Sequence, residues 1–261
     1  ADVRHFGSYR RFHLVNVKGT EHMLCAARER KARFLLVSTV SVGGMCLAGE
    51  GSGEVPFRES DLYIGQELGN VYLRSKFEAE CLVLDARREG YPCTVFRVGN
   101  LTNRYVDGIF QPNYRENAFL SRMKVFLGLE SLPSAIADDF LEFSPVDCTA
   151  EAIVRLAGYA DRGYSVFHAD NPKRMTYRQL AVMFGRAGCR VEVTDTEVFL
   201  QKLRGTAGSI YDSVKNEMKE RDAMEGHARV VPDNAFTVRC LKEAGFEWPD
   251  ITQEYVGWYR A

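Results

Sequence analysis

The sequence predicts an α/β fold in which helices wrap a parallel sheet, followed by a smaller, mostly helical lobe. Two observations carry this prediction: helical and strand patterns alternate through the first half of the chain, and the strands there are short apolar runs. Strands that crossover helices bury on both faces are typical of parallel sheets. A length of 261 residues, 46% of them hydrophobic, suits one large domain or one domain with a smaller lobe.

Apolar spacing and breaker residues set the elements of the first half. In chain order these are a helix over 9–30, a strand over 34–37, a helix over 71–89 and a strand over 94–98. Gly90 and Pro92 end the second helix. Residues 43–70 are rich in glycine and polar side chains and predict a long loop.

The second half is less regular. It predicts helices over 115–127, 148–159 and 176–187, strands over 164–168 and 190–193, and further helices after them. We therefore expect a first domain over 1–110 and a lobe over 111–261, with some strands of the lobe returning to the main sheet.

Composition excludes several classes of protein. Net charge is −1, from 34 basic and 35 acidic residues, whereas nucleic-acid and anionic-membrane binding need a basic excess. No apolar run approaches the ~20 residues that span a bilayer, and the first residues lack the apolar core of a signal peptide. Seven scattered cysteines without a CxxC pair predict free, buried thiols in a cytoplasmic protein. The five histidines form no cluster, so we expect no metal site.

The strongest chemical pattern is Tyr72-Leu-Arg-Ser-Lys76, which places Tyr72 and Lys76 one turn apart on one helix face. A tyrosine with a pKa near ~10 is a poor acid at neutral pH. A neighbouring ammonium stabilises phenolate and lowers that pKa, so the pair suits proton delivery to a carbonyl that receives hydride. The same spacing also fits a half-buried tyrosine in a helix-surface pair, and only its context favours catalysis.

That context is the strand over 34–37, which ends in Ser38-Thr39-Val40-Ser41-Val42. A hydroxyl past the carboxyl end of a parallel strand lies where open α/β sheets bind ligands. Thr39 can there hydrogen-bond a substrate oxygen. Alone, Thr39 would be read as a turn or cap residue.

Together these segments resemble the extended short-chain dehydrogenase/reductases, which share the Ser-Thr strand end and Tyr-x-x-x-Lys. Asn16-Val-Lys-Gly-Thr20, Arg97-Val-Gly-Asn100 and Pro145-Val-Asp147 also match that family. Within it, five segments resemble the terminal thioester reductase domains of nonribosomal peptide synthetases and carboxylic acid reductases: 37–42, 72–80, 97–101, 108–113 and 142–147. The resemblance runs from residue 1 to about residue 160 and continues weakly through 240–246.

The resemblance implies a Rossmann-type parallel sheet whose N-terminal strands are absent from the chain. Residues 1–110 would be the second half of the cofactor domain, and residues 111–261 the substrate or carrier lobe. Thr39, Tyr72 and Lys76 would be catalytic, with Lys76 also holding the nicotinamide ribose. Asn16 would be an accessory residue near the site, although a helix asparagine can also only brace the active-site strand. Asp147 lies in a segment that matches the family, but its position favours the simpler role of N-cap for the helix over 148–159.

Cofactor contacts are implied for a short set of residues: Ser38, Lys76, Arg97, Val98, Gly99, Asn100 and Leu101. The family opens with a strand, a glycine-rich turn and a helix that binds the pyrophosphate. Neither Gly43-Gly44 nor the glycines at 49, 51 and 53 both follow a strand and open a helix. We therefore expect this chain alone to bind the cofactor weakly.

The implied activity is NADPH-dependent reduction of an acyl or peptidyl thioester, held on the phosphopantetheine arm of a carrier protein. The product would be an aldehyde, and further reduction to an alcohol is left open. Two alternatives stay open: a nucleotide-sugar epimerase or dehydratase of the same extended family, and a non-catalytic fragment that only docks a carrier.

Overall fold

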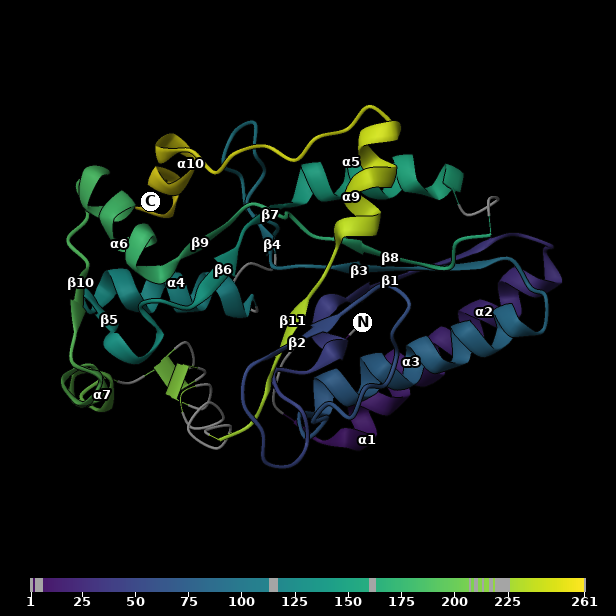
Figure 1. Cartoon of the computed structure of the whole chain (residues 1–261), viewed down its shortest axis with the longest axis horizontal. Helices are drawn as coiled ribbons and strands as arrows, with labels where there is room; N and C mark the ends of the chain where they lie inside the picture. The colour runs from purple at the N-terminus through teal and green to yellow at the C-terminus, as the bar shows by residue number, and fades with distance from the viewer. Residues whose placement is uncertain are drawn as a thin grey trace. The chain divides into compact units, whose positions relative to one another are not determined.

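The computed structural model describes residue 2 and residues 7–112, 117–159, 163–206, 208, 211–212, 214–215, 218 and 226–260 (Figure 1). Two predicted features reach beyond these ranges. Asn113, the last residue of the 108–113 segment, and residues 115–116, at the start of the helix predicted over 115–127, lie outside the described residues.

The chain forms two compact units. The first, here called the sheet unit, comprises Ala1–Gly99, Cys148–Asp170 and Gly226–Glu247; the second, the lobe unit, comprises Asn100–Asp147, Asn171–Glu225 and Trp248–Ala261. The sequence predicts a single boundary between residues 110 and 111, with some strands of the second half returning to the main sheet, as β8 does. The division differs because two strands from the second half of the chain pair inside the sheet unit, so the chain returns to it twice.

The centre of the sheet unit is a three-stranded parallel sheet in the order β1-β3-β8, as the sequence predicts for its first two strands (Figure 1). The strands are β1 (Phe34–Thr39), β3 (Cys93–Val98) and β8 (Val166–Ala169). β3 is buried along its whole length. Among the described residues β1 pairs on one side only, and its Leu35 and Val37 side chains are 39% and 48% exposed.

The helices of the sheet unit that have a predicted range agree with it to within two residues at each end, and α9 is one of the further helices that were expected without a range. They are α1 (Tyr9–Phe12), η1 (His13–Lys18) and α2 (Gly19–Glu29), which run on without a break, α3 (Val71–Arg88), α5 (Val146–Ala157), which begins in the lobe unit, and α9 (Ala235–Glu243). Leu24 of α2 and Val83 of α3 share a buried cluster with Val95 of β3, because each helix turns its apolar stripe toward the sheet.

The predicted loop over 43–70 contains a strand, which corrects that expectation. β2 (Glu54–Phe57) pairs in parallel with β11 (Arg229–Pro232). Four residues that include Pro56 carry little strand signal, and the partner strand lies far along the sequence, so local patterns could not reveal the pairing.

Among its described residues the lobe unit contains three two-stranded ladders and several helices. Its strands are β4 (Leu101–Thr102), β5 (Ser131–Pro133), β6 (Phe140–Glu142), β7 (Ser144–Pro145), β9 (Arg174–Thr176) and β10 (Glu192–Thr194), paired as β4-β7, β5-β10 and β6-β9. Its main helices are α4 (Ala118–Gly128), α6 (Tyr177–Arg186), α7 (Thr196–Arg204) and α10 (Gln253–Gly257).

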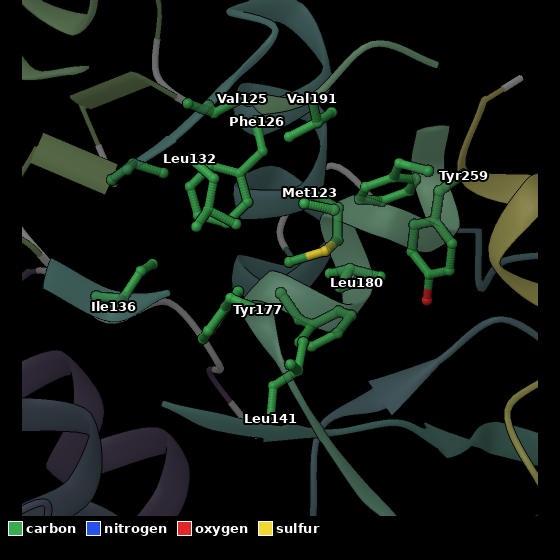
Figure 2. Packing of buried hydrophobic residues seen from close by; sticks show 14 of the residues in the cluster. Met123, Val125, Phe126, Leu132, Ile136, Leu141, Tyr177, Leu180, Val191 and Tyr259 are labelled. Atoms are coloured by element: carbon green, nitrogen blue, oxygen red, sulfur yellow. The ribbon is translucent and has the colours of Figure 1, made fainter. Parts of the chain in front are cut away.

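A large buried cluster of hydrophobic side chains from helices and strands forms the core of the lobe unit. Figure 2 shows Phe126 of α4, Leu132 of β5 and Leu180 of α6 within it. The cluster is rich in aromatic rings, several in edge-to-face contact, such as Phe126 on Tyr177 with their centroids 5.9 Å apart. The lobe unit therefore has an apolar core of its own.

Asp147 does not cap α5 as predicted. The helix begins at Val146, and the Asp147 carboxylate, in its first turn, accepts the backbone N–H of Tyr105 at 2.9 Å. Asp147 thus ties the loop after β4 to the start of α5.

Other expectations concern the surface and the thiols. All seven cysteines are free, but only Cys46, Cys93 and Cys240 are buried, and Cys25 is exposed. Within the described ranges no helix is both long and apolar enough to cross a membrane. The same residues include no group of three or more His, Cys, Asp or Glu side chains arranged to hold a metal ion.

Candidate active site

Thr39 stands at the carboxyl end of β1, as the sequence predicts. Its hydroxyl accepts the backbone N–H of Ser41 at 3.2 Å, which caps the short 3₁₀ turn η2 (Val40–Gly43). The same hydroxyl hydrogen-bonds the phenol of Tyr72. The structure therefore gives Thr39 both the cap role and a place beside the candidate proton donor.

Tyr72 is the second residue of α3, and its placement depends on the start of that helix. The side chain of Asn70 accepts the N–H groups of Tyr72 and Leu73, which satisfies donors that a helix start leaves open. Burial raises the pKa of Tyr72 to about 12, and the hydrogen bond from Thr39 lowers it only in part.

The raised pKa of Tyr72 corrects the expectation that the neighbouring Lys76 ammonium lowers it. The phenol therefore stays protonated at neutral pH, which is the state a proton donor needs.

Lys76 is almost fully buried, and its ammonium donates to the backbone carbonyl of Val37 at 3.0 Å. Burial lowers the pKa of Lys76, whereas the carboxylate of Glu80 raises it. The structure thus ties Lys76 to the strand that carries Thr39. Thr39, Tyr72 and Lys76 meet at the junction of β1 and α3, within the sheet unit.

Asn16 acts as a brace in the structure. It lies in the π-helical segment η1, a local widening that is frequent at functional sites. Its amide donates to the hydroxyl of Ser75 at 2.9 Å, and Ser75 lies in α3 between Tyr72 and Lys76. Its amide oxygen accepts the backbone N–H of Asp2 at 2.7 Å. Asn16 therefore steadies the catalytic turn of α3.

The predicted cofactor segment 97–101 crosses the boundary between the units: Arg97 to Gly99 belong to the sheet unit, and Asn100 and Leu101 to the lobe unit. The side chain of Arg97 is fully buried and bonded to Glu80 and His168. It has no surface to offer a cofactor, so that part of the prediction is corrected and only the backbone of Arg97 remains a candidate.

A buried glutamate fixes the lobe end of this segment. The Glu142 carboxylate accepts the backbone N–H of Asn100 and, at 2.7 Å, the hydroxyl of Ser144. The backbone N–H of Ser144 in turn donates to the carbonyl of Asn100 at 3.0 Å. These bonds set the backbone direction at the start of β4.

Two observations fit a nicotinamide ribose at this site. The Ser38 hydroxyl, one residue before Thr39, is buried and has no hydrogen-bond partner among the described residues. Lys76 has three N–H donors, and one of them is bonded to the carbonyl of Val37.

A site for the cofactor's pyrophosphate is not found among the described residues, which offer no strand, glycine turn and helix in succession. The glycines at 49, 51 and 53 precede β2, and no helix begins there.

Sequence reasoning missed three polar residues that support the site: Ser75, Glu80 and Glu142. Glu80 had a usable signal, because it follows Lys76 by four residues and so lies on the same buried helix face. An acid on such a face requires a buried partner. Nothing local marks Ser75 or Glu142, whose partners come from distant segments.

Comparison with known proteins now adds the family. The model of the Male sterility protein family, an NAD-binding family, matches residues 1–153. A linear gramicidin synthase protein of Brevibacillus parabrevis is 26% identical over 247 residues, which is 92% of this chain and 5% of that protein. Isonitrile lipopeptide synthase of Streptomyces coeruleorubidus is 30% identical, over 98% of this chain and 17% of that protein.

Solved structures agree. The thiolation-reductase di-domain of an archaeal non-ribosomal peptide synthetase superposes with a TM-score of 0.82 at 30% identity, covering 100% of this chain and 55% of that one. The terminal R domain of the myxalamid PKS-NRPS biosynthetic pathway superposes with a TM-score of 0.84 at 27% identity, and the match covers 100% of this chain and 65% of that one. The chain therefore spans small fractions of the synthases and about half to two thirds of the solved reductase chains.

A putative epimerase from Burkholderia cenocepacia shares the fold alone, with a TM-score of 0.62 at 18% identity. Three solved structures at 27–30% identity, which include the reductase domain of the aureusimine biosynthetic cluster, contain reductase domains of biosynthetic systems. Because the family model matches more than half of its residues, the chain belongs to the NAD-binding Male sterility protein family.

Proposed function

We propose that this chain carries the catalytic residues of an NADPH-dependent reductase that releases an acyl or peptidyl thioester from the phosphopantetheine arm of a carrier protein. The product is an aldehyde and the enzyme is cytoplasmic. One observation carries the proposal: the hydroxyls of Thr39 and Tyr72 are hydrogen-bonded, and Lys76 is tied to the strand that holds Thr39. The similarity to reductase domains of peptide synthetases supports the substrate class.

The chemistry assigns one task to each side chain. A bound NADPH supplies the hydride that the thioester carbonyl carbon accepts. Tyr72 donates its phenolic proton to the carbonyl oxygen, and Thr39 hydrogen-bonds the same oxygen while negative charge develops there. Lys76 holds a ribose hydroxyl with its spare donors, and Ser38 offers its unpaired hydroxyl nearby.

The proposed reaction converts the thioester to an aldehyde and a free thiol in two steps. Hydride and proton add across the C=O bond to give a hemithioacetal. The hydroxyl of the hemithioacetal then gives up its proton as the C=O bond re-forms and the C–S bond breaks. The sulfur takes up a proton and leaves as the free pantetheine thiol, and the aldehyde remains.

Mass spectrometry of a carrier-bound acyl thioester, incubated with NADPH and the protein that contains this chain, tests the proposal. We expect aldehyde and free pantetheine thiol in equal amounts. We also expect faster turnover than with the same acyl group on a short thiol, because remote binding energy can raise kcat.

Equal rates on the two substrates would contradict a carrier-docked reductase. Oxidation or epimerisation of a nucleotide sugar by the same protein would favour the sugar-enzyme alternative. Binding of the carrier without any turnover would favour the docking fragment.

A further inference from the structure

A fully buried ion pair joins α3, the helix that carries Tyr72 and Lys76, to the central strand β3. The carboxylate of Glu80 and the guanidinium of Arg97 are both 0% exposed. Two guanidinium nitrogens, Nη2 and Nε, donate to Oε2 of Glu80 at 2.9 and 3.0 Å. Removing charges from water is costly, so a pair of this kind persists only where further bonds satisfy both partners.

Arg97 meets that condition through its other donors. Its Nη2 donates to the carbonyl of Asp61 at 2.8 Å, and its Nη1 lies 3.1 Å from Nε2 of His168. The Nδ1 atom of His168 lies 2.9 Å from the carbonyl of Asp233. Because Arg97 can only donate and a carbonyl can only accept, this network assigns a neutral His168 with its proton on Nδ1. The ring of Phe57 packs on the guanidinium, 4.6 Å from its centroid.

Both members of the pair touch the catalytic elements. Glu80 follows Lys76 by four residues, so it lies one helical turn, about 6 Å, further along the same face of α3. Arg97 is the residue of β3 that pairs in register with Ser38 of β1, the residue between Val37 and Thr39. The pair therefore joins the Lys76 turn of α3 to the strand next to the one that Lys76 itself contacts.

We propose that Glu80 and Arg97 are a positioning pair for Lys76, holding its helix turn against the sheet and setting the electrostatic balance at its ammonium. This rests on the proposed function, in which Lys76 acts as a charged group. Neither residue touches substrate or cofactor; both act through Lys76.

The charges around Lys76 make this balance specific. Among the described residues, Glu80 on the same helix is the carboxylate that acts on the Lys76 ammonium, and Arg97 of β3 is the ion-pair partner of Glu80. The carbonyl of Val37 on β1 accepts a hydrogen bond from Lys76, and the titratable Tyr63, from the segment before α3, packs its ring on Phe77. Charged side chains from the other packed elements are engaged elsewhere: Tyr9 and His13 with Glu78 and Arg74, Glu21 with Lys18, and Arg28 with Glu89.

Two single substitutions should move the Lys76 titration in opposite directions. Glu80→Gln removes the carboxylate that raises the pKa of Lys76 and leaves Arg97 uncompensated, so the midpoint falls. Arg97→Gln leaves the Glu80 carboxylate unpaired, so the midpoint rises. A charge at this range is worth about one pH unit or more. The double variant Glu80→Gln/Arg97→Gln, which removes both charges, should return the midpoint toward that of the unsubstituted protein.

The direct measurement is NMR of the protein with lysine labelled at Nζ, titrated with pH and assigned by the Lys76→Arg variant. Asp85→Asn is the matched control, since it removes a carboxylate from the same helix that is exposed and paired with Arg88. We expect no movement of the Lys76 midpoint in that control. The midpoint reports only on folded molecules, so partial unfolding of a variant does not obscure its direction.

A structural role alone would lower stability in both single variants and leave the midpoint unchanged, and that result would overturn the proposal. A shift of the Lys76 midpoint in the same direction in both single variants would also overturn the proposal. In the active enzyme the high-pH limb of kcat should follow the same two directions. Absence of thioester reduction by the unsubstituted protein would contradict the proposed function alone, because the NMR titration needs no turnover.

Discussion

A tyrosine whose proton is hard to remove is at the centre of the candidate site. Burial raises the pKa of Tyr72 to about 12, and the Thr39 hydroxyl is the group that works against this rise. Burial lowers the pKa of Lys76, so on raising the pH the ammonium loses its proton before the phenol does. The proposed reduction needs a protonated phenol, and the raised pKa of Tyr72 favours that state.

Tyr72→Phe tests this assignment. The substitution removes the hydroxyl and leaves the ring, so the fold should be retained. We expect thioester reduction to fall by about 10²-fold or more, as for the loss of a general acid. Steady-state rates with carrier-bound substrate, together with circular dichroism of both proteins, measure this. Turnover close to that of the unsubstituted protein would remove Tyr72 from the mechanism.

Tyr72, Lys76 and Thr39 could be predicted from the sequence because short-range rules decide where they lie. Helical period places the first two on one face, and the end of an apolar strand places the third. The partners of Arg97 could not be predicted, since Glu80, His168 and the 58–61 loop reach it only in the folded chain. The direction of the Tyr72 pKa shift was missed for the same reason: burial, which local sequence does not reveal, outweighs the hydrogen bond from Thr39.

Among the secondary-structure elements, local signals succeeded for the long helices and failed for paired short strands. α3 begins at a side-chain cap and ends at Arg88, two residues before Gly90, whose φ of 90° suits glycine. β2 and β11, by contrast, are four residues each and become strands only through each other. Such strands depend on tertiary pairing, and sequence patterns do not detect them.

The loop after β4 offers a sharp test of packing in the lobe unit. Gly108 has a φ of 71°, and a Cβ there would lie 2.4 Å from the ring of Trp258. Gly108→Ala should therefore destabilise the protein, because both the backbone and the indole would have to shift. The expected loss is about 1–3 kcal/mol, measured by chemical denaturation.

Gly185→Ala is the matched control in the same unit. Gly185 lies in α6, is exposed and has no atom near the position of a Cβ. Alanine there should stabilise the protein by up to about 1 kcal/mol, because glycine in a helix has a larger loss of backbone entropy. Equal destabilisation by both substitutions would mean that the contact with Trp258 is not what makes position 108 intolerant.

Taken as a whole, the chain brings the three proposed catalytic side chains together in the sheet unit, but its described residues include no cradle for the pyrophosphate. We expect the isolated 261-residue chain to bind NADPH weakly or not at all, because Lys76 and Ser38 provide only the ribose end of a site. Calorimetric titration decides this, with Lys76→Ala to identify any residual binding at the site. A tight complex with one NADPH per chain would show that the cofactor is held elsewhere.

The one-sided pairing of β1 has a consequence for the behaviour of the isolated chain in solution. Among the described residues no strand pairs with the outer edge of β1, which also exposes apolar side chains, and such an edge is a template on which a second copy can add its own strand. We expect concentration-dependent self-association, visible by analytical ultracentrifugation. Leu35→Lys should reduce it, since charge on an edge strand opposes such pairing. Val154→Lys replaces a more exposed apolar residue on helix α5 and should leave self-association unchanged. Equal effects of the two substitutions would indicate non-specific association through exposed apolar side chains instead of pairing at β1.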